Sequence, residues 1–361
     1  MTEAWYALEG AESDVVIASK IKLFRNLANF PFPEKLGPGE DERIQSIVLD
    51  GFNSLEDGDK FQAIKISQLD SVGSKVMKER GLCSGNFTRG GIILRDDGVL
   101  SCTVNETEHL CISSVSSGFE IDKVKAMSFS VDSQLQKKIQ FAASYDFGYL
   151  TSSILNSGSG MKIDITLHLP CLSLLKKIPS FMALCAKEKF MLASTFGSGS
   201  SGFIGSGDGT SLGSYYELIS GGSCGGSEFD QIAGAVTLCR KMINAEREAR
   251  TECKNTMFSS IKNIVFRALS VARSSIFVTL RESIDIISAI KIALDFHLIK
   301  GITQGDLHAL LYRVQNGQLE FVLNNGSFNF EEDIENNSMK KNERLRALVL
   351  KEAFENLKLD I

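Results

Sequence analysis

Residues 91–105 read GIILRDDGVLSCTVN, in which two runs rich in aliphatic and β-branched side chains flank the pair Asp97-Gly98. An Asp-Gly pair between two such runs is the strongest short-range signal for a β-hairpin. The sequence therefore predicts two antiparallel strands here. An extended pattern resumes over residues 109–115, so we expect a third strand to follow the hairpin.

Two further segments alternate between two sets of side chains, which is the period of a β-strand. Residues 14–24 place Lys20 and Lys22 side by side on one face of the expected strand. Residues 161–169 place apolar side chains on one face and polar side chains, beginning with Lys162, on the other. Both segments therefore predict strands that carry lysines on a single face.

Several strands at hairpin spacing, interrupted by helices such as one expected over residues 134–143, indicate an antiparallel sheet flanked by helices, an α+β architecture. All five prolines lie in the first half of the chain, and the last part carries an apolar period of 3.6 residues with almost no helix breakers. We therefore expect a mixed domain over residues 1–250 and an α-helical domain over residues 251–361. Helices are expected in the second domain near 257–271, 283–298, 306–315 and 341–358.

The composition is that of an ordinary soluble globular chain, with 361 residues, 43% hydrophobic residues and a net charge of −5. The negative charge gives no electrostatic reason to expect a nucleic acid as partner. The eight cysteines include no C-x-x-C pair and the four histidines are scattered, so neither a disulfide framework nor a metal site is predicted. The acidic start lacks a secretory signal, and no stretch reaches about 18 uncharged apolar residues, so we expect a cytoplasmic protein with no membrane partner.

Residues 197–226 contain eleven glycines between a strand-like segment and a helix expected to begin near Glu228. Gly197, Gly199 and Gly202 match the pattern G-x-G-x-x-G, but no helix pattern opens at the third glycine, as a dinucleotide site requires. A long glycine-rich lid is the better interpretation of this stretch. Gly-x-Ser-x-Gly matches inside such a tract arise by chance, so a serine hydrolase is not indicated.

Three segments are informative when they are taken together. Residues 16–26 read VIASKIKLFRN and are followed by FPFP at 30–33, residues 104–112 read VNETEHLCI, and residues 147–162 read FGYLTSSILNSGSGMK before LHLP at 167–170. The first resembles the opening of the catalytic domain of the ATP:guanidino phosphotransferases, the phosphagen kinases, particularly the bacterial protein-arginine kinases. The second resembles the N-E-E-D-H-x-R signature of that family, and the third resembles its G-Y-L-T-S-C-P-T-N-x-G-T-G-x-R segment.

The resemblance implies an eight-stranded antiparallel sheet flanked by helices, and transfer of the γ-phosphoryl group of ATP, with Mg²⁺, to a guanidinium group of a protein arginine. A guanidinium is protonated and poorly nucleophilic at neutral pH, so carboxylates must orient it and accept a proton. Arginines neutralise the triphosphate in a transfer that depends mostly on positioning and electrostatics.

The chain departs from the family at all five positions of the phosphate-binding arginines. These positions align with Lys20, Lys22, Cys111, Lys162 and Phe203, and three of them lie in a stretch of the chain that contains no arginine. Lysine keeps the positive charge but lacks the planar fork that grips phosphate with two bonds. The resemblance implies a nucleotide site of weakened affinity formed by Ser19, Lys20, Lys22, Cys111, Lys162, Gly205 and Gly207.

The position of the catalytic glutamate aligns with Thr107, which Glu106 and Glu108 flank. The reactive cysteine of the guanidine pocket becomes Ser153, and the glutamate of the glycine-rich loop becomes Asp208. The candidate catalytic residues are therefore Glu106, Glu108, Ser153 and Asp208. A threonine does not act as a base near neutral pH, so ordinary arginine kinase activity is expected to be impaired.

Two segments near the end, LIKGI at 298–302 and NERLRA at 342–347, resemble the closing segments of the bacterial branch. The second aligns with R-D-x-x-R-A, a phosphoarginine-docking motif. Glu343 stands for its acid and Arg346 is retained, whereas Asn342 replaces its first arginine. Glu343 and Arg346 are therefore candidate docking residues.

Two functions stay open at the level of the sequence. The first is a divergent protein-arginine kinase, with catalysis weakened or lost, which uses its lysines and a neighbouring carboxylate. The second is a catalytically inactive pseudo-kinase that acts as a protein-binding adaptor or regulator. The partners implied are ATP and a protein substrate or partner, such as a protease or stress-response component, and a homodimer is also left open.

Overall fold

The computed structural model describes residues 4–84, 87, 89–197, 211–221 and 227–360. In these residues the main sheet is antiparallel and has eight strands in the order β2-β3-β4-β5-β1-β8-β10-β9. Its strands are β1 (Val16–Arg25), β2 (Phe61–Lys65), β3 (Gly91–Arg95), β4 (Leu100–Val104), β5 (Leu110–Ser117), β8 (Met161–His168), β9 (Phe190–Ser194) and β10 (Tyr215–Ser220). The expected α+β class with an antiparallel sheet is confirmed.

The hairpin predicted at Asp97-Gly98 joins β3 to β4, with Ile92 opposite Thr103. Gly98 has a φ of 71°, and its N–H donates to the Arg95 carbonyl at 2.8 Å. A positive φ favours glycine, which explains why this turn is readable from the sequence. The expected third strand is β5, and it pairs with both β4 and β1.

The sheet has one apolar face and one polar face, because side chains alternate along each strand. Ile21, Leu23, Ile163 and Ile165 are at most 1% exposed on the apolar face. Helix α3 (Ile121–Leu135) packs on β1 and β5 at this face, and helix α6 (Glu228–Thr256) packs on β8 and β10. The polar face lies on the other side of the same strands, where α3 and α6 do not cover it, and it carries the candidate functional site.

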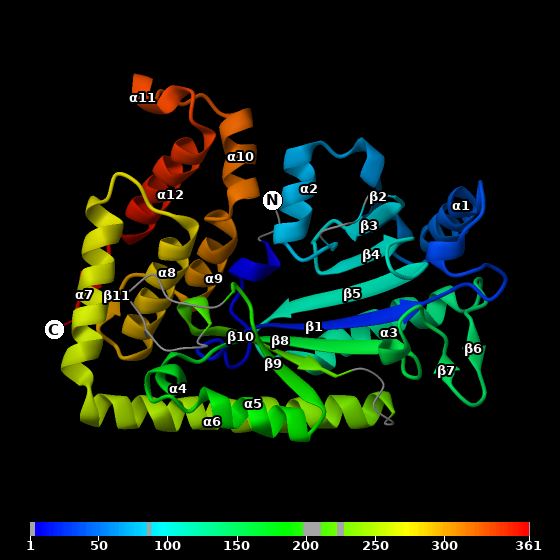
Figure 1. Cartoon of the computed structure of the whole chain (residues 1–361), viewed down its shortest axis with the longest axis horizontal. Helices are drawn as coiled ribbons and strands as arrows, with labels where there is room; N and C mark the ends of the chain where they lie inside the picture. Colours follow the sequence, from blue (N-terminus) through cyan, green and yellow to red (C-terminus); the bar gives the residue numbers. More distant parts are fainter. Residues whose placement is uncertain (1–3, 85–86, 88, 198–210, 222–226, 361) are drawn as a thin grey trace.

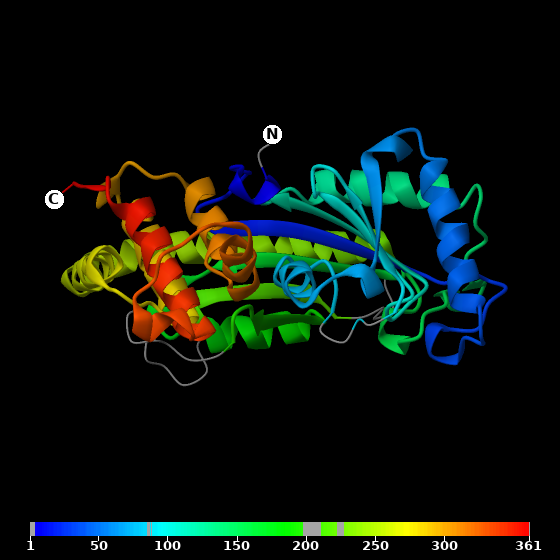
Figure 2. The same cartoon turned by 90° about the horizontal axis from the view of Figure 1, so that it is seen from above.

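The remaining helices lie at the ends and edges of the sheet (Figures 1 and 2). In the first part of the chain they are α1 (Glu40–Asn53), α2 (Ser71–Glu79), α4 (Pro170–Leu174) and α5 (Ile178–Lys187). In the last part they are α7 (Phe258–Ser274), α8 (Leu280–Asp295), α9 (Gln304–Arg313), α10 (Asn316–Asn325), α11 (Glu332–Glu335) and α12 (Ser338–Phe354). Two short hairpins complete the fold, β6 (Ala143–Ser144) with β7 (Gly148–Tyr149), and β11 (Ile299–Lys300) with β12 (Lys358–Leu359).

The helix expected over residues 134–143 is wrong. Helix α3 ends at Leu135, and Gln136 is its C-cap. Phe141 instead forms an isolated antiparallel bridge with Leu27, where it is 9% exposed. Burial of the Phe141 ring beside the end of β1 therefore outweighs the local helical pattern.

Helix α6 begins as expected at Glu228, because Ser227 and Asp230 form a reciprocal capping box. The helix continues through residue 250, where the domain boundary is expected, and that boundary stays a prediction. No helix in the described ranges is long and apolar enough to cross a membrane.

Candidate functional site

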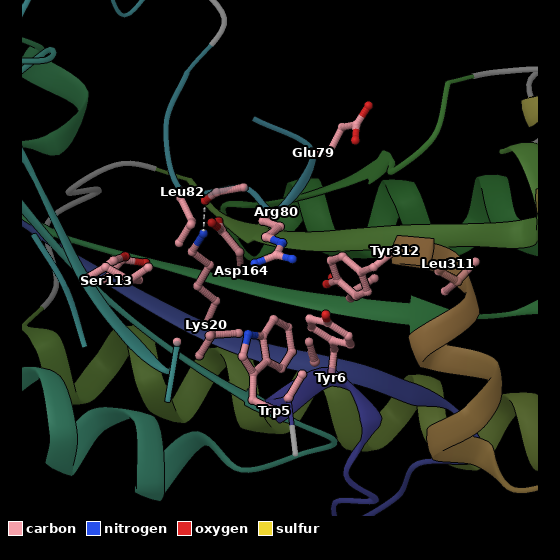
Figure 3. A pocket seen from close by; sticks show the side chains of 18 of the residues that line it. Trp5, Tyr6, Lys20, Glu79, Arg80, Leu82, Ser113, Asp164, Leu311 and Tyr312 are labelled. Carbon is pink, nitrogen blue, oxygen red and sulfur yellow. Dashed lines mark hydrogen bonds between the residues drawn. The ribbon is translucent and has the colours of Figure 1, made fainter. Parts of the chain in front are cut away.

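A cavity of about 460 Å³ lies on the polar face of the sheet (Figure 3). Its floor comes from the middle strands and includes Lys20, Ser113 and Asp164. Its walls come from distant parts of the chain: the 3₁₀ turn η1 (Trp5–Ala7), the end of α2, and α9. Aromatic rings join two of these walls, since Tyr6 stacks on Tyr312 with 4.5 Å between ring centroids. The cavity is therefore enclosed by both halves of the chain.

The strand register brings the three predicted lysines together on this polar face. Lys20 and Lys22 alternate along β1, and Lys162 lies directly opposite Lys22 on β8. The Lys20 ammonium donates to the carbonyl of Gly81, just after α2, at 2.6 Å. Burial, together with repulsion from Lys22, lowers the pKa of Lys20 to about 8.

Two carboxylates that the sequence reasoning did not single out lie among these lysines. Asp164 lies opposite Lys20 in the β1–β8 register, and one of its oxygens is 2.7 Å from the Lys22 ammonium. The Asp164 charge raises the pKa of Lys22 in spite of burial. The second carboxylate is Glu217 on β10. Burial, together with the negative charge of nearby Asp164, raises the pKa of Glu217. The sequence does contain a signal for Asp164, because the period of two along residues 161–169 places it on the same face as Lys162.

Cys111 lies on the same polar face, near the start of β5, and pairs with Thr103 of β4. Burial raises the pKa of its thiol to about 11. Cys111 is therefore a neutral thiol at neutral pH, and it supplies no positive charge at a position where the resemblance implies an arginine. Ser19, by contrast, points to the opposite face, where its hydroxyl donates to the Gly118 carbonyl at 2.8 Å and lies apart from the lysines.

The segment between β4 and β5 carries the predicted catalytic carboxylates in two different environments. Glu108 is 1% exposed and accepts hydrogen bonds from the Ser152 N–H at 2.8 Å, the Ser152 hydroxyl at 2.9 Å and the Asn26 amide at 2.6 Å. Glu106 is half-buried and accepts from the Thr103 hydroxyl at 2.8 Å. Thr107 is exposed between them. Glu108 thus anchors the loop before β8, while Glu106 lies at the end of the polar face.

Ser153 is exposed in the loop that Glu108 anchors, and its carbonyl accepts from the Thr151 hydroxyl at 2.7 Å. Gly205, Gly207 and Asp208 lie outside the described residues, as does Phe203. The structure thus gathers Lys20, Lys22, Cys111 and Lys162 on one face, with Glu106 at its end, and the roles predicted for these residues stay predictions. No cluster of three metal-ligating side chains occurs in the part of the chain that the structure describes.

A family model for the C-terminal catalytic domain of ATP:guanido phosphotransferases matches residues 43–249, which is more than half of the chain. The chain belongs to this family. Among curated proteins, it is 25% identical over 335 residues to a protein-arginine kinase of Clostridium acetobutylicum, covering 91% of this chain and 96% of the relative. It is 27% identical over 316 residues to a protein-arginine kinase of Desulforamulus reducens, covering 85% of each.

Solved structures of ATP:guanido phosphotransferases share the fold. A duplicated taurocyamine kinase from Schistosoma mansoni superposes with a TM-score of 0.57 at 17% identity, over 68% of this chain and 35% of that one. A lombricine kinase superposes with a TM-score of 0.57 at 14% identity, over 68% and 69%. At these identities the likeness shows the fold alone.

The ATP implied by the family does not fit the charges on the polar face. Of the three lysines there, Lys22 is paired with Asp164, and Glu217 adds a second carboxylate to the face. The cavity is also lined by the cations Arg80 and Arg95 and by the carboxylates of Glu79, Asp96 and Asp97. The stretch 198–210 contains no lysine or arginine that could add to them. A triphosphate needs a surplus of positive charge, and this face offers little.

The predicted phosphoarginine-docking residues lie in α12, which contributes no residue to the lining of the cavity in the part of the chain that the structure describes. Arg346 is 1% exposed, and its guanidinium donates to the carbonyls of Val314 at 2.8 Å and Val278 at 3.0 Å. Burial lowers its pKa to about 10. The Glu343 carbonyl accepts from the Val278 N–H at 3.2 Å. Arg346 therefore holds three helical segments together, and a phosphoarginine would reach it only if these segments separated.

Proposed function

We propose that this ATP:guanido phosphotransferase relative has lost efficient phosphoryl transfer and acts as a protein-binding regulator. The environment of Thr107 carries the proposal. Thr107 stands where the family has its catalytic glutamate, and the neighbouring Glu108 is turned inward and held by Asn26 and Ser152.

The loss of one general base costs about 10²- to 10⁴-fold in rate. The loss of a transition-state arginine costs roughly 10³- to 10⁵-fold. Such losses do not simply add. Even the smaller figure, together with the charge balance in the cavity, supports a chain that is not an efficient kinase.

Exposed apolar side chains support the protein-binding role. Phe147, Ile154 and Leu155 are 68%, 87% and 69% exposed, and Tyr145 is fully exposed. They lie on the β6–β7 hairpin and the loop after it, which are joined by an antiparallel bridge between Tyr149 and Gly158. Large apolar side chains gathered at a protein surface mark interaction sites.

A weak protein-arginine kinase is the second candidate, and the position of Glu106 favours it. Glu106 is half-buried near Cys111, and its charge contributes to raising the pKa of that thiol. A carboxylate next to the vacated position of the base is placed to accept a proton from an arginine guanidinium. In this candidate the acceptor is a protein arginine and ATP with Mg²⁺ is the donor.

The deciding experiment incubates the chain with γ-labelled ATP, Mg²⁺ and an arginine-rich protein, and measures label that is stable to base and labile to acid. We expect no more label than in a mixture without the chain. The variants Glu106→Gln and, as a matched control on the exposed helix α11, Glu332→Gln are assayed beside it. Label that disappears in Glu106→Gln and persists in Glu332→Gln would establish the weak kinase and refute the loss of transfer.

We also propose the cytoplasm as the location of the chain. Seven cysteines are free thiols in the described residues, as expected in a reducing compartment. The protease or stress-response partner and the homodimer stay predictions.

A further inference from the structure

Asp164 occupies the middle of the lysine group on the polar face. It is 4% exposed, lies opposite Lys20 across the strand pair, and forms a 2.7 Å ion pair with Lys22. Its second carboxylate oxygen has no hydrogen-bond partner in the part of the chain that the structure describes. Asp164 also lines the cavity, as Figure 3 shows. The Asp164 carboxylate is therefore already bound to the Lys22 ammonium, the group with which a phosphate oxygen would have to pair.

A phosphate group that approached Lys22 would have to compete with this carboxylate. The carboxylate is fixed by its strand and costs no entropy of association, whereas a free anion loses translational freedom on binding. The second oxygen of Asp164, and Glu217 beyond it, repel each additional negative charge of the ligand. The repulsion grows with the charge of the ligand, so it acts most strongly on polyphosphates.

We propose that Asp164, at the border of the cavity, determines which anions the polar face accepts: its carboxylate takes the place of a phosphate oxygen on the neighbouring Lys22 and thereby excludes polyphosphates such as ATP. The inference rests on the proposed loss of phosphoryl transfer and gives it a cause in one residue. Asp164 is thus a specificity-determining residue. Lys20, whose ammonium meets the neutral carbonyl of Gly81, stays available for a ligand of lower charge.

The test measures binding of pyrophosphate and of ATP, each with and without Mg²⁺, by titration calorimetry. Asp164→Asn and Asp164→Ser remove the charge, and the second also removes the bulk beside Lys22. Asp96→Asn is the matched control, because Asp96 lines the same cavity but is exposed and pairs with Gln62 at 3.1 Å. We expect both Asp164 variants to bind each probe roughly tenfold or more tightly than the parent, with a steeper salt dependence. Asp96→Asn is expected to stay within about threefold.

A second measurement needs no variant. An acylating reagent is applied to the parent, and modification of single lysines is followed by mass spectrometry with and without ATP. We expect Lys22 to react more slowly than Lys162, because it is paired with Asp164, and ATP to leave its rate unchanged. Protection of Lys22 by ATP in the parent would overturn the proposal.

The proposal would also be overturned if both Asp164 variants bound the probes no more tightly than Asp96→Asn does. The same holds if no variant binds either probe. Because the readouts are binding and lysine reactivity, they are independent of phosphoryl transfer. Arginine phosphorylation by the parent contradicts the proposed function, whereas equal ATP affinity in the parent and the Asp164 variants contradicts this inference alone.

Discussion

Glu246 in α6 is a fully buried carboxylate that the catalytic resemblance does not explain. It accepts the backbone N–H groups of Cys171 at 2.9 Å and Leu172 at 3.0 Å, and so caps the start of α4. Burial nevertheless outweighs these donors and the nearby Arg250, and raises the pKa of Glu246 to about 7. At Glu246, burial favours the protonated carboxyl group, whereas the two N–H donors favour the ionised one.

We predict that Glu246 makes the free energy of unfolding fall as the pH rises from about 4.5 to about 7. In this window the folded chain retains a proton that the unfolded chain releases, so raising the pH favours unfolding. The full effect is about 3 kcal/mol, since one pKa unit corresponds to about 1.4 kcal/mol. Urea denaturation of the parent and of Glu246→Gln across this range measures it as the difference between the two curves.

The matched control is Glu248→Gln, because Glu248 is exposed on the same helix. It should follow the pH dependence of the parent. If Glu246→Gln also follows the parent, the carboxylate is ionised throughout this range, and the two N–H donors have outweighed burial.

At the scale of elements, helix α10 receives its N-terminal cap from a distant helix. Its own N-cap residue, Gln315, makes no side-chain cap bond. Glu79 at the end of α2 accepts the N–H groups of Gly317 at 2.7 Å and Gln318 at 3.2 Å instead. The ion pair of Lys75 with Glu320, at 2.6 Å, joins the same two helices. Two different contacts thus hold α2 beside the cavity.

We predict that Glu79→Ala destabilises the chain more than Lys75→Met. A carboxylate that caps a helix N-terminus contributes about 0.5–2 kcal/mol. An exposed ion pair contributes about 0–1 kcal/mol, and the Lys75 side chain is 50% exposed. Urea denaturation of both variants gives the comparison, and a larger loss in Lys75→Met would assign the contact to the ion pair.

These elements show what the sequence could and could not predict. The hairpin, the two lysine-bearing strands and the start of α6 follow from signals within a few residues: a turn pair, a period of two and a capping box. Helix α10 was missed because its cap lies more than 200 residues away in the chain. The Lys22–Asp164 pair was missed for a related reason, since a charge pair across strands depends on the register of the sheet.

Several residues of the candidate site could be predicted from the sequence, but the orientation of the Glu108 side chain could not. The resemblance located Lys20, Lys22, Cys111 and Lys162, and the strand register places them on one face. It did not indicate that Glu108 is turned inward, because that orientation depends on Asn26 and on the loop at Ser152.

At the scale of the molecule, a partly buried charge network joins the two halves. Asp14, before β1, pairs with Arg250 of α6 at 2.8 Å, and Arg250 also pairs with Asp295 of α8 at 3.2 Å. Lys291 of α8 is fully buried and donates to the carbonyl of Ser13 at 2.9 Å. Separation of the halves would break both the Arg250–Asp295 pair and the Lys291–Ser13 hydrogen bond, so these contacts couple the two halves.

We therefore predict that the chain unfolds in one transition, although two domains were expected from the sequence. Trp5 is the single tryptophan of the chain, and its ring centroid lies 5.8 Å from that of Tyr312 in α9. Its fluorescence reports separation of the halves, while circular dichroism reports loss of helix. Coincident urea midpoints are expected. A fluorescence change that precedes the loss of helix would show that the halves part before they unfold.

The walls of the cavity have a thermodynamic consequence. Since Trp5 and Tyr6 come from the start of the chain and Tyr312 from helix α9, a molecule that fills the space is held only while both segments are in place. Because such a ligand binds only the folded chain, its binding raises the free energy of unfolding of the whole chain. Small molecules that raise the melting temperature of the full chain are thus candidate ligands of the cavity, and the search needs no assay of catalysis.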